Sequence, residues 1–229
     1  MTFENKKTAP LIRTDGNIGA GKSTLQDILV KRISGLKLVP EPIKHWQSIT
    51  DKDGKNILDK FYLDPIKYAG LFQMYAFITR LEELHKAYNS KDATDTKVWL
   101  SERSIHSDMN IFATNAYETG LMDEIEFKVY EDTYNTWLKL FTLKTRPDLT
   151  IYIRTSPKVC MERIKKRART EEKTTIKMEY LEQLHKKYEE WLGKQKDIII
   201  IDGDTEYIYN EEEINKIVAT IQEKLKQLS

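Results

Sequence analysis

The stretch that most restricts the fold of this chain is residues 16–24, which read GNIGAGKST. It matches the pattern G-x-x-x-x-G-K-[ST], a phosphate-binding loop that joins a β-strand to a helix. Glycines at positions 16, 19 and 21 allow the tight turn that directs successive N–H groups at phosphate oxygens, and the following helix adds the positive end of its dipole. The motif therefore predicts a nucleotide site built on a strand, a loop and a helix.

Every residue of this loop belongs to the predicted phosphate site: Gly16, Asn17, Ile18, Gly19, Ala20, Gly21, Lys22, Ser23 and Thr24. Lys22 is expected to reach the β and γ phosphates and to take part in catalysis. Ser23 is expected to hold Mg²⁺, because a hydroxyl is a hard oxygen ligand suited to a small, strongly hydrated cation. The loop leaves open which group accepts the phosphate.

Composition favours a single domain, residues 1–229, long enough to bury a sizeable core. Its 37 basic and 36 acidic residues argue against a broad nucleic-acid-binding surface. The lone Cys160 excludes an internal disulfide and fits a reducing compartment. No signal or transit peptide is recognisable, and no apolar run reaches the ~20 residues of a membrane span. We expect a cytoplasmic protein, with mitochondria as the alternative, and neither nucleic acid nor membrane as a partner.

Short apolar runs alternate with longer helical patterns, which is typical of a parallel sheet with helical crossovers. The expected strands are Leu36–Val39, Val98–Leu100, Leu149–Ile153 and Ile198–Ile201. Helical spacing covers Pro65–Tyr88, the region of Asp123–Phe141, and Glu179–Leu192. Before the phosphate loop only Leu11 and Ile12 are apolar, followed by Arg13 and Thr14, so the central strand is predicted to be short or unusually polar.

Two polar clusters follow expected strands. Pro40-Glu41-Pro42 ends the second strand, and Ser101-Glu102-Arg103-Ser104 ends the third. Because open α/β sheets bind ligands at the carboxyl ends of their strands, these clusters and the phosphate loop converge on one crevice. A carboxylate there can accept the proton of an attacking hydroxyl, and an arginine beside it can orient that hydroxyl and stabilise developing charge. The crevice is therefore suited to phosphoryl transfer.

Polar residues also lie on an otherwise apolar helix face. Gln73, Ala76 and Arg80 are spaced i, i+3 and i+7, so one face carries an amide, a small residue and a guanidinium. Asp108 and Phe112 are likewise four apart. Single aromatic residues usually pack in a core, but a buried glutamine and arginine need polar partners. These residues are therefore candidates for a binding pocket.

Six stretches together resemble the deoxynucleoside kinase family, which groups deoxycytidine, deoxyguanosine, deoxyadenosine and insect multisubstrate kinases. They are GNIGAGKST, VPEPIKHW, FQMYAFITR, ERSIHSDMNIF, RIKKRARTEE and EYLEQLHKKYEEWL, within about Gly16 to Tyr207. The resemblance implies a P-loop α/β fold, a five-stranded parallel sheet flanked by helices, with a short arginine-rich lid at about residues 163–177. It also implies a homodimer that salvages nucleotides by transferring the γ-phosphate of an ATP-type donor, with Mg²⁺, to the 5′-hydroxyl of a deoxynucleoside.

The resemblance also assigns residues to roles. Glu41 would be the general base, Arg103 its partner at the reacting centre, and Glu102 a carboxylate on the magnesium side together with Ser23. The deoxynucleoside pocket would consist of Ile43, Trp46, Leu58, Phe61, Tyr62, Phe72, Gln73, Ala76, Arg80, Arg103, Asp108, Phe112 and Glu172. Tyr62 and Glu172 would hold the sugar 3′-hydroxyl.

Donor and base choice are only partly constrained. Arg163, Arg167 and Arg169 would form the lid over the donor phosphates, in a loop one residue longer than in relatives, and Glu206 and Tyr207 would lie near the donor base, ATP or UTP. Asp108 would accept from an exocyclic amino group, and Arg80 and Gln73 could donate to guanine. Thymidine is therefore expected to be a poor substrate, with deoxyadenosine, deoxycytidine and deoxyguanosine left open.

Two other functions compete with this interpretation. A nucleoside monophosphate kinase of the thymidylate type shares the sheet and the phosphate loop, but needs a basic pocket for the acceptor's phosphate. A GTP-binding switch protein would need base-reading motifs, which DKDG at 51–54 and TRPD at 145–148 match only superficially. Selective GTP binding with turnover independent of nucleoside would identify the latter.

Overall fold

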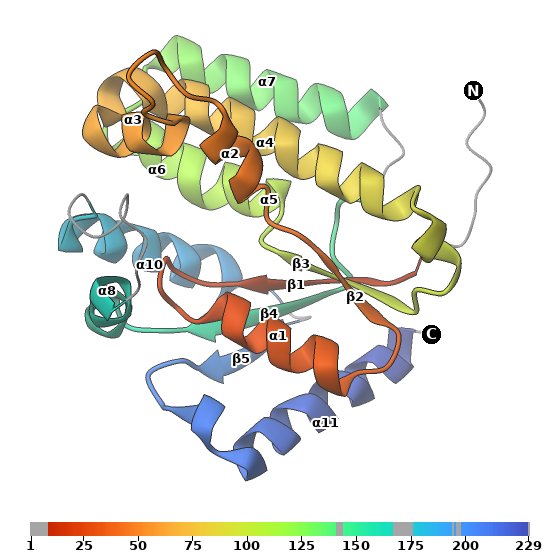
Figure 1. Cartoon of the computed structure of the whole chain (residues 1–229). Coiled ribbons are helices and arrows are strands. Elements are labelled where there is room, and N and C mark those ends of the chain that lie inside the picture. Colours follow the sequence, from red (N-terminus) through yellow and green to blue (C-terminus); the bar gives the residue numbers. More distant parts are fainter. Residues whose placement is uncertain (1–8, 141–143, 167–175, 194, 196–197, 229) are drawn as a thin grey trace.

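The computed structural model describes residues 9–140, 144–166, 176–193, 195 and 198–228. Five parallel strands form one sheet in the order β2-β3-β1-β4-β5 (Figure 1). The strands are β1 (Leu11–Asp15), β2 (Leu36–Val39), β3 (Val98–Glu102), β4 (Leu149–Arg154) and β5 (Ile198–Asp202). The predicted five-stranded parallel α/β sheet is confirmed, and β1, which leads into the phosphate loop, lies at its centre.

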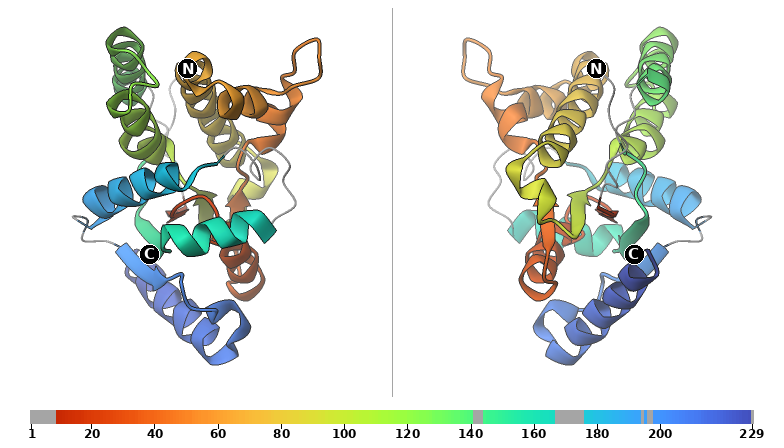
Figure 2. Two further views of the ribbon diagram at one scale, coloured as in Figure 1. Left: turned by 90° about the vertical axis from the view of Figure 1, so that its left-hand side faces the viewer. Right: turned by 90° about the vertical axis from the view of Figure 1, so that its right-hand side faces the viewer.

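Helices cover both faces of the sheet (Figures 1 and 2). The long helices α4 (Pro65–Tyr88) and α7 (Glu124–Leu140) lie on one side, and α1 (Lys22–Arg32) and α11 (Glu211–Leu228) lie on the other. Shorter helices complete the layer around α4: α2 (Ile43–Ser48), α3 (Ile57–Leu63), α5 (Ile105–Ser107), the π-helix Asp108–Ala113 and α6 (Thr114–Glu118). Helices α8 (Pro157–Lys166) and α10 (Met178–Leu192) pack against each other. Short 3₁₀ turns occupy Lys91–Thr94 and Tyr207–Tyr209.

The long helices have the predicted extents to within two residues. Helix α4 begins at Pro65, whose missing N–H costs nothing in a first turn, and the Asp64 side chain caps it by accepting from the Lys67 N–H. Helix α10 ends at Leu192, followed by Gly193. None of the described helices has the length and apolar character needed to cross a membrane.

Strand β1 is polar, as predicted, but it is not short. All five residues are buried, with Ile12 and Thr14 on one face and Leu11, Arg13 and Asp15 on the other. Arg13 pairs with Asp15 at 3.2 Å and donates to Ser104 Oγ at 3.0 Å, while its guanidinium lies 4.5 Å from the Trp191 ring centroid. Neighbouring elements therefore supply the polar partners that allow these charges to be buried.

Candidate active site

The phosphate loop is held in shape by contacts from distant parts of the chain. Gly16, Gly19 and Gly21 adopt φ values of +148°, +79° and +95°. Asn17 donates its side-chain amide to Leu181 O at 2.8 Å, and Lys22 Nζ donates to Asn17 O at 2.9 Å. Since Lys22 is also the first residue of α1, its ammonium lies at the positive end of that helix. The loop is thus ordered to receive negative charge.

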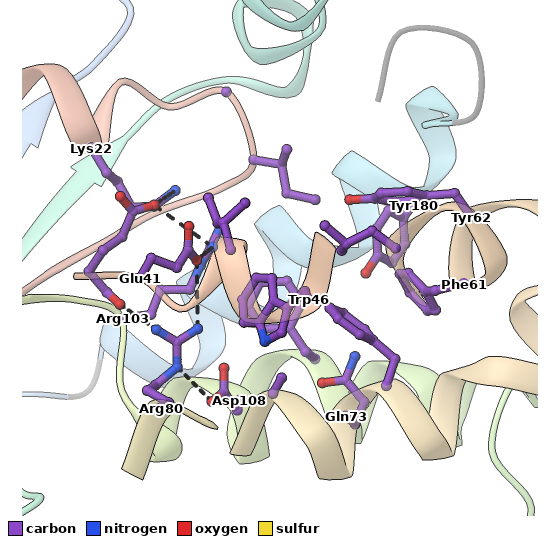
Figure 3. A pocket seen from close by; sticks show the side chains of 18 residues that line it. Lys22, Glu41, Trp46, Phe61, Tyr62, Gln73, Arg80, Arg103, Asp108 and Tyr180 are labelled. Atoms are coloured by element: carbon purple, nitrogen blue, oxygen red, sulfur yellow. Dashed lines mark hydrogen bonds and ion pairs between the residues drawn. The ribbon is translucent and has the colours of Figure 1, made fainter. Parts of the chain in front are cut away.

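The carboxyl ends of β2 and β3 bring opposite charges beside this loop (Figure 3). Glu41 Oε1 lies 3.2 Å from Arg103 Nη1 and 3.6 Å from Arg80 Nη2. Glu102 lies 3.5 Å from Lys22 Nζ and accepts a hydrogen bond from Ser23 Oγ at 3.0 Å. Arg103 has a φ of +58°, the only described non-glycine residue in the left-handed region, and such strained positions cluster at functional sites.

A pocket extends from this charged cluster and encloses about 720 Å³, including solvent at its mouth. One wall of the pocket is aromatic. Trp46 and Phe72 pack edge to face with ring centroids 5.3 Å apart, and Phe61 and Phe72 stack with ring centroids 5.0 Å apart. The polar wall consists of Gln73, Arg80 and Asp108, with Arg80 Nε donating to Asp108 at 2.8 Å (Figure 3). A flat, partly polar molecule larger than a phosphate fits such a pocket.

The family model for deoxynucleoside kinase matches residues 12–226. The chain belongs to the deoxynucleoside kinase family. A probable deoxycytidine kinase of fowlpox virus is 35% identical over 237 residues, covering 100% of this chain and 94% of the relative. Deoxycytidine kinase 2 of Gallus gallus is 39% identical over 194 residues, covering 79% of this chain and 73% of the relative. Human mitochondrial thymidine kinase 2 is 34% identical over 207 residues, covering 88% of this chain and 73% of the relative.

Membership of the deoxynucleoside kinase family makes this chain a kinase. The pKa values of its two site glutamates, Glu41 and Glu102, are shifted in opposite directions. Burial and the nearby Glu102 raise the pKa of Glu41, against the opposing effect of Arg103 and Arg80. Burial acts the same way on Glu102, but Lys22 and Arg103 outweigh it and lower its pKa. One carboxylate is therefore suited to take up a proton, and the other to stay ionised.

The donor set fits a magnesium ion that is held mainly by nucleotide phosphates. Ser23 Oγ and the Glu102 carboxylate are hard oxygen ligands within hydrogen-bond distance of each other, next to Lys22. Among the described residues there is no group of three or more His, Cys, Asp or Glu side chains that could form a metal cage. Mg²⁺ requires none, because it keeps water and phosphate oxygens in its octahedral shell.

The structure brings nearly all the predicted substrate residues to one pocket. Those that line it are Ile43, Trp46, Leu58, Phe61, Tyr62, Phe72, Gln73, Ala76, Arg80, Arg103, Asp108 and Phe112, together with Ile18, Gly19, Lys22, Glu41 and Glu102. Glu172, Arg167 and Arg169 lie outside the described residues. Asp108 and Phe112 share the π-helix, a form often found at functional sites.

The predicted donor-side residues are more scattered. Arg163 lies against the phosphate loop and donates to Ala20 O at 3.2 Å. Glu206 is exposed. Tyr207 is only 4% exposed and packs in the core with α8 and α11 residues, so its ring is not presented for stacking on a base in this conformation. Its role in donor binding stays a prediction.

Helix α10 brings two tyrosines to the site, and sequence reasoning missed Tyr188. Tyr180 lines the pocket, and Tyr188 accepts a hydrogen bond from Arg103 Nε at 3.2 Å. Tyr188 is on the same apolar stripe as Leu181, Leu184 and Leu192, so the helical pattern marks it as core. The only available signal is that a tyrosine in a buried stripe needs a partner for its hydroxyl.

Proposed function

We propose that this protein transfers the γ-phosphate of an ATP-type nucleoside triphosphate to the 5′-hydroxyl of a deoxynucleoside, for nucleotide salvage. The observation that carries the proposal is the position of Glu41. Its carboxylate, largely but not fully buried and paired with Arg103, lies between the phosphate loop and the aromatic pocket. A base that acts on a hydroxyl next to a γ-phosphate must lie in such a position. Relatives named as deoxycytidine kinases support the acceptor class.

In the proposed reaction, Glu41 accepts the proton of the 5′-hydroxyl as that oxygen attacks the γ-phosphorus. Arg103 orients Glu41 through their 3.2 Å ion pair and stabilises charge on the transferring group. Lys22 and the N–H groups of the phosphate loop bind the donor phosphates, with Ser23 and Glu102 as the residues that would hold Mg²⁺. The ion, when bound, neutralises charge on the phosphate oxygens.

The polar wall of the pocket favours a substrate whose nucleobase carries an exocyclic amino group. Asp108 is 3% exposed, and its carboxylate is held by Arg80, so it presents an acceptor to the pocket. Thymine carries a carbonyl where cytosine and adenine carry an amino group, and two acceptors facing each other repel. Guanine also carries a carbonyl at that edge, but Arg80 and Gln73 could donate to its O6 and N7, a pair of acceptors that thymine lacks. We therefore place thymidine below deoxycytidine, deoxyadenosine or deoxyguanosine as a substrate.

Initial rates with Mg²⁺-ATP and each of deoxycytidine, deoxyadenosine, deoxyguanosine, thymidine and thymidylate test the proposal, repeated with Glu41→Gln. We expect an unphosphorylated deoxynucleoside to be converted and the glutamine variant to lose at least about 100-fold in kcat while it still binds nucleoside. Turnover of thymidylate alone, or ATP hydrolysis that ignores nucleoside, would contradict it. Thymidine as efficient as the best other deoxynucleoside would contradict the base preference only.

We extend the proposal to the whole protein as a single-domain, cytoplasmic homodimer with a lid at about residues 163–177, of which residues 167–175 lie outside the described part of the chain. Notably exposed apolar residues on the adjacent helices α4 and α7 support a second copy as partner: Leu71 is 59% and Val129 is 54% exposed. Among the aromatic side chains of neighbouring helices, Tyr117 of α6 is 39% exposed, whereas Phe77 of α4 lies in the core. The buried thiol of Cys160 suits a reducing compartment.

A further inference from the structure

Helix α10 provides a contact to the catalytic arginine from a distant part of the sequence. Tyr188 is completely buried, and its hydroxyl accepts from Arg103 Nε at 3.2 Å across 85 residues of sequence. Its ring stacks on Tyr152 of β4 with centroids 5.7 Å apart. The phenol is therefore fixed by packing, and it is not among the residues that line the pocket.

The three nitrogens of Arg103 have different partners. Nη1 faces Glu41 at 3.2 Å, Nη2 donates to Gly16 O at 3.4 Å, and Nε donates to Tyr188. Because a guanidinium is planar, fixing Nε sets the direction of both Nη groups. The Phe112 ring, 4.8 Å from the guanidinium carbon, restricts the plane but offers no directed hydrogen bond. Tyr188 thus supplies the directed contact at Nε, which orients the fork together with the contact of Nη2 to Gly16 O.

The surroundings of Tyr188 keep its phenol protonated. Burial and the negative charge of Asp15 raise the pKa of Tyr188 well above its usual value, so the phenol stays neutral and its oxygen remains an acceptor for Arg103. Asp15 is 0% exposed, accepts from Ser107 Oγ at 2.7 Å, and has a second oxygen, Oδ1, without a hydrogen-bond partner among the described residues. A buried carboxylate oxygen of this kind favours a neighbouring O–H.

We propose that Tyr188 is a positioning residue for phosphoryl transfer, whose hydroxyl holds Arg103 Nε so that Nη1 stays directed at Glu41. This rests on the proposed function. Tyr188 acts through Arg103 and not on substrate. Its loss should therefore lower kcat and leave nucleoside binding intact, and it should also change the acid limb of the pH profile, since Arg103 lowers the pKa of Glu41.

The test compares Tyr188→Phe with Tyr152→Phe. Tyr152 is a matched control, because it is 2% exposed and stacks on the Tyr188 ring. Its hydroxyl donates to Glu189 at 2.8 Å and has no contact with Arg103 among the hydrogen bonds of the described residues. We expect Tyr188→Phe to lower kcat about tenfold or more, as for loss of a hydrogen bond to a charged group, with KM for the deoxynucleoside changed less than about twofold. Its acid limb should move to higher pH. Tyr152→Phe should change neither quantity.

A double-mutant cycle with Arg103→Lys isolates the link, because lysine has no Nε–H group to meet the phenol. In that background Tyr188→Phe should have little further effect on kcat. Equal losses in both backgrounds, or a Tyr188→Phe variant that matches Tyr152→Phe, would overturn the proposal. If Tyr188→Phe does not fold, Asp15→Asn replaces it, with the same direction expected and an unchanged kcat overturning the proposal. Full activity of Glu41→Gln would instead refute the proposed function, so the two failures are distinguishable.

Discussion

Six charged side chains of the site are buried in alternating pairs. Lys22, Arg80 and Arg103 face Glu41, Glu102 and Asp108, and each of the six is 12% exposed or less at its side chain. Burying an isolated charge is costly, so such a set persists only when every member has an opposite partner. Breaking one pair would leave its partner charge buried and unpaired. Burial, together with the nearby Glu102, raises the pKa of Glu41 toward a useful range for a base, although Arg103 and Arg80 oppose the shift.

The raised pKa of Glu41 predicts the pH dependence of the reaction. A general base must be ionised, so kcat/KM should fall as pH drops through the pKa of Glu41, which lies above the ~4.3 of an ordinary glutamate. Arg103 is the cation that most lowers this pKa, so in residual activity of Arg103→Gln the acid limb should lie at still higher pH. Rate profiles from acid to neutral pH check this. An acid limb at an ordinary carboxyl pKa, or one unmoved by the substitution, would contradict it.

The residues of the site differ in how far the sequence reveals them. The phosphate loop and Glu41 could be predicted because each depends on a local motif and its place after a strand. Gln73, Ala76 and Arg80 could be predicted because helical periodicity places them on one face. Tyr188 could not, since its role depends on α10 packing behind Arg103, a contact between segments 85 residues apart that no periodicity encodes.

At the scale of elements, the same limit applies to β1. Its polar residues weaken the expected strand pattern, yet β1 extends over all of Leu11–Asp15. Its two charged side chains, Arg13 and Asp15, can be buried because later segments supply their partners: Ser104, Ser107, Trp191 and Gln195. The α4 helix shows the opposite case. Its periodicity, its cap at Asp64 and Pro65 in the first turn all lie within the segment itself, so its extent was predictable.

The packing of α8 against the phosphate loop gives a prediction at this scale. A Cβ on Gly19 would lie 2.6 Å from Cys160 O and 2.9 Å from Ile164 Cγ1, so Gly19→Ala forces α8 away from the loop. We expect a loss of about 1–3 kcal/mol in unfolding free energy beyond the backbone strain, and a raised KM for ATP. Gly54→Ala is the matched control, because Gly54 has nearly the same φ, +77° against +79°, with open space around it.

The control variant should lose only about 1–2 kcal/mol, the strain of an L-residue in the left-handed region, with KM for ATP unchanged. Urea unfolding and initial rates against ATP concentration measure both quantities. Equal destabilisation of the two variants would show that α8 and the loop can move apart with no loss of unfolding free energy, which would contradict tight packing between them.

At the scale of the whole molecule, two buried layers meet at the site. One core lies between the sheet and helices α1, α8 and α11, and the other lies within the layer of α2, α3, α4 and α7. Helix α10 adds a third cluster, packed on Tyr152 of β4 and Ile111 of the π-helix. It is thus placed to couple the nucleoside pocket, through Tyr180, with the phosphate side, through Tyr188 and Arg103.

The outer face of the α4 and α7 layer predicts the oligomeric state. Leu71 and Ile78 are seven residues apart on α4, Ile125 and Val129 are four apart on α7, and all four are between 40% and 74% exposed. The two helices are adjacent, since a Cβ on Gly70 would lie 3.1 Å from Glu126 Oε1. Apolar side chains gathered on neighbouring helices favour burial against the same face of a second copy.

We therefore expect the protein to elute with the mass of a dimer, and Leu71→Asp combined with Val129→Asp to give monomers, because burying two charges per subunit outweighs the apolar contact. Light scattering after size exclusion measures the mass. The control is Tyr209→Asp, an 80% exposed aromatic in the 3₁₀ turn before α11, away from α4 and α7, which should leave the dimer intact (Figure 1). A monomeric parent protein, or a dimer that survives the paired aspartates, would place the exposed apolar face outside any interface between copies.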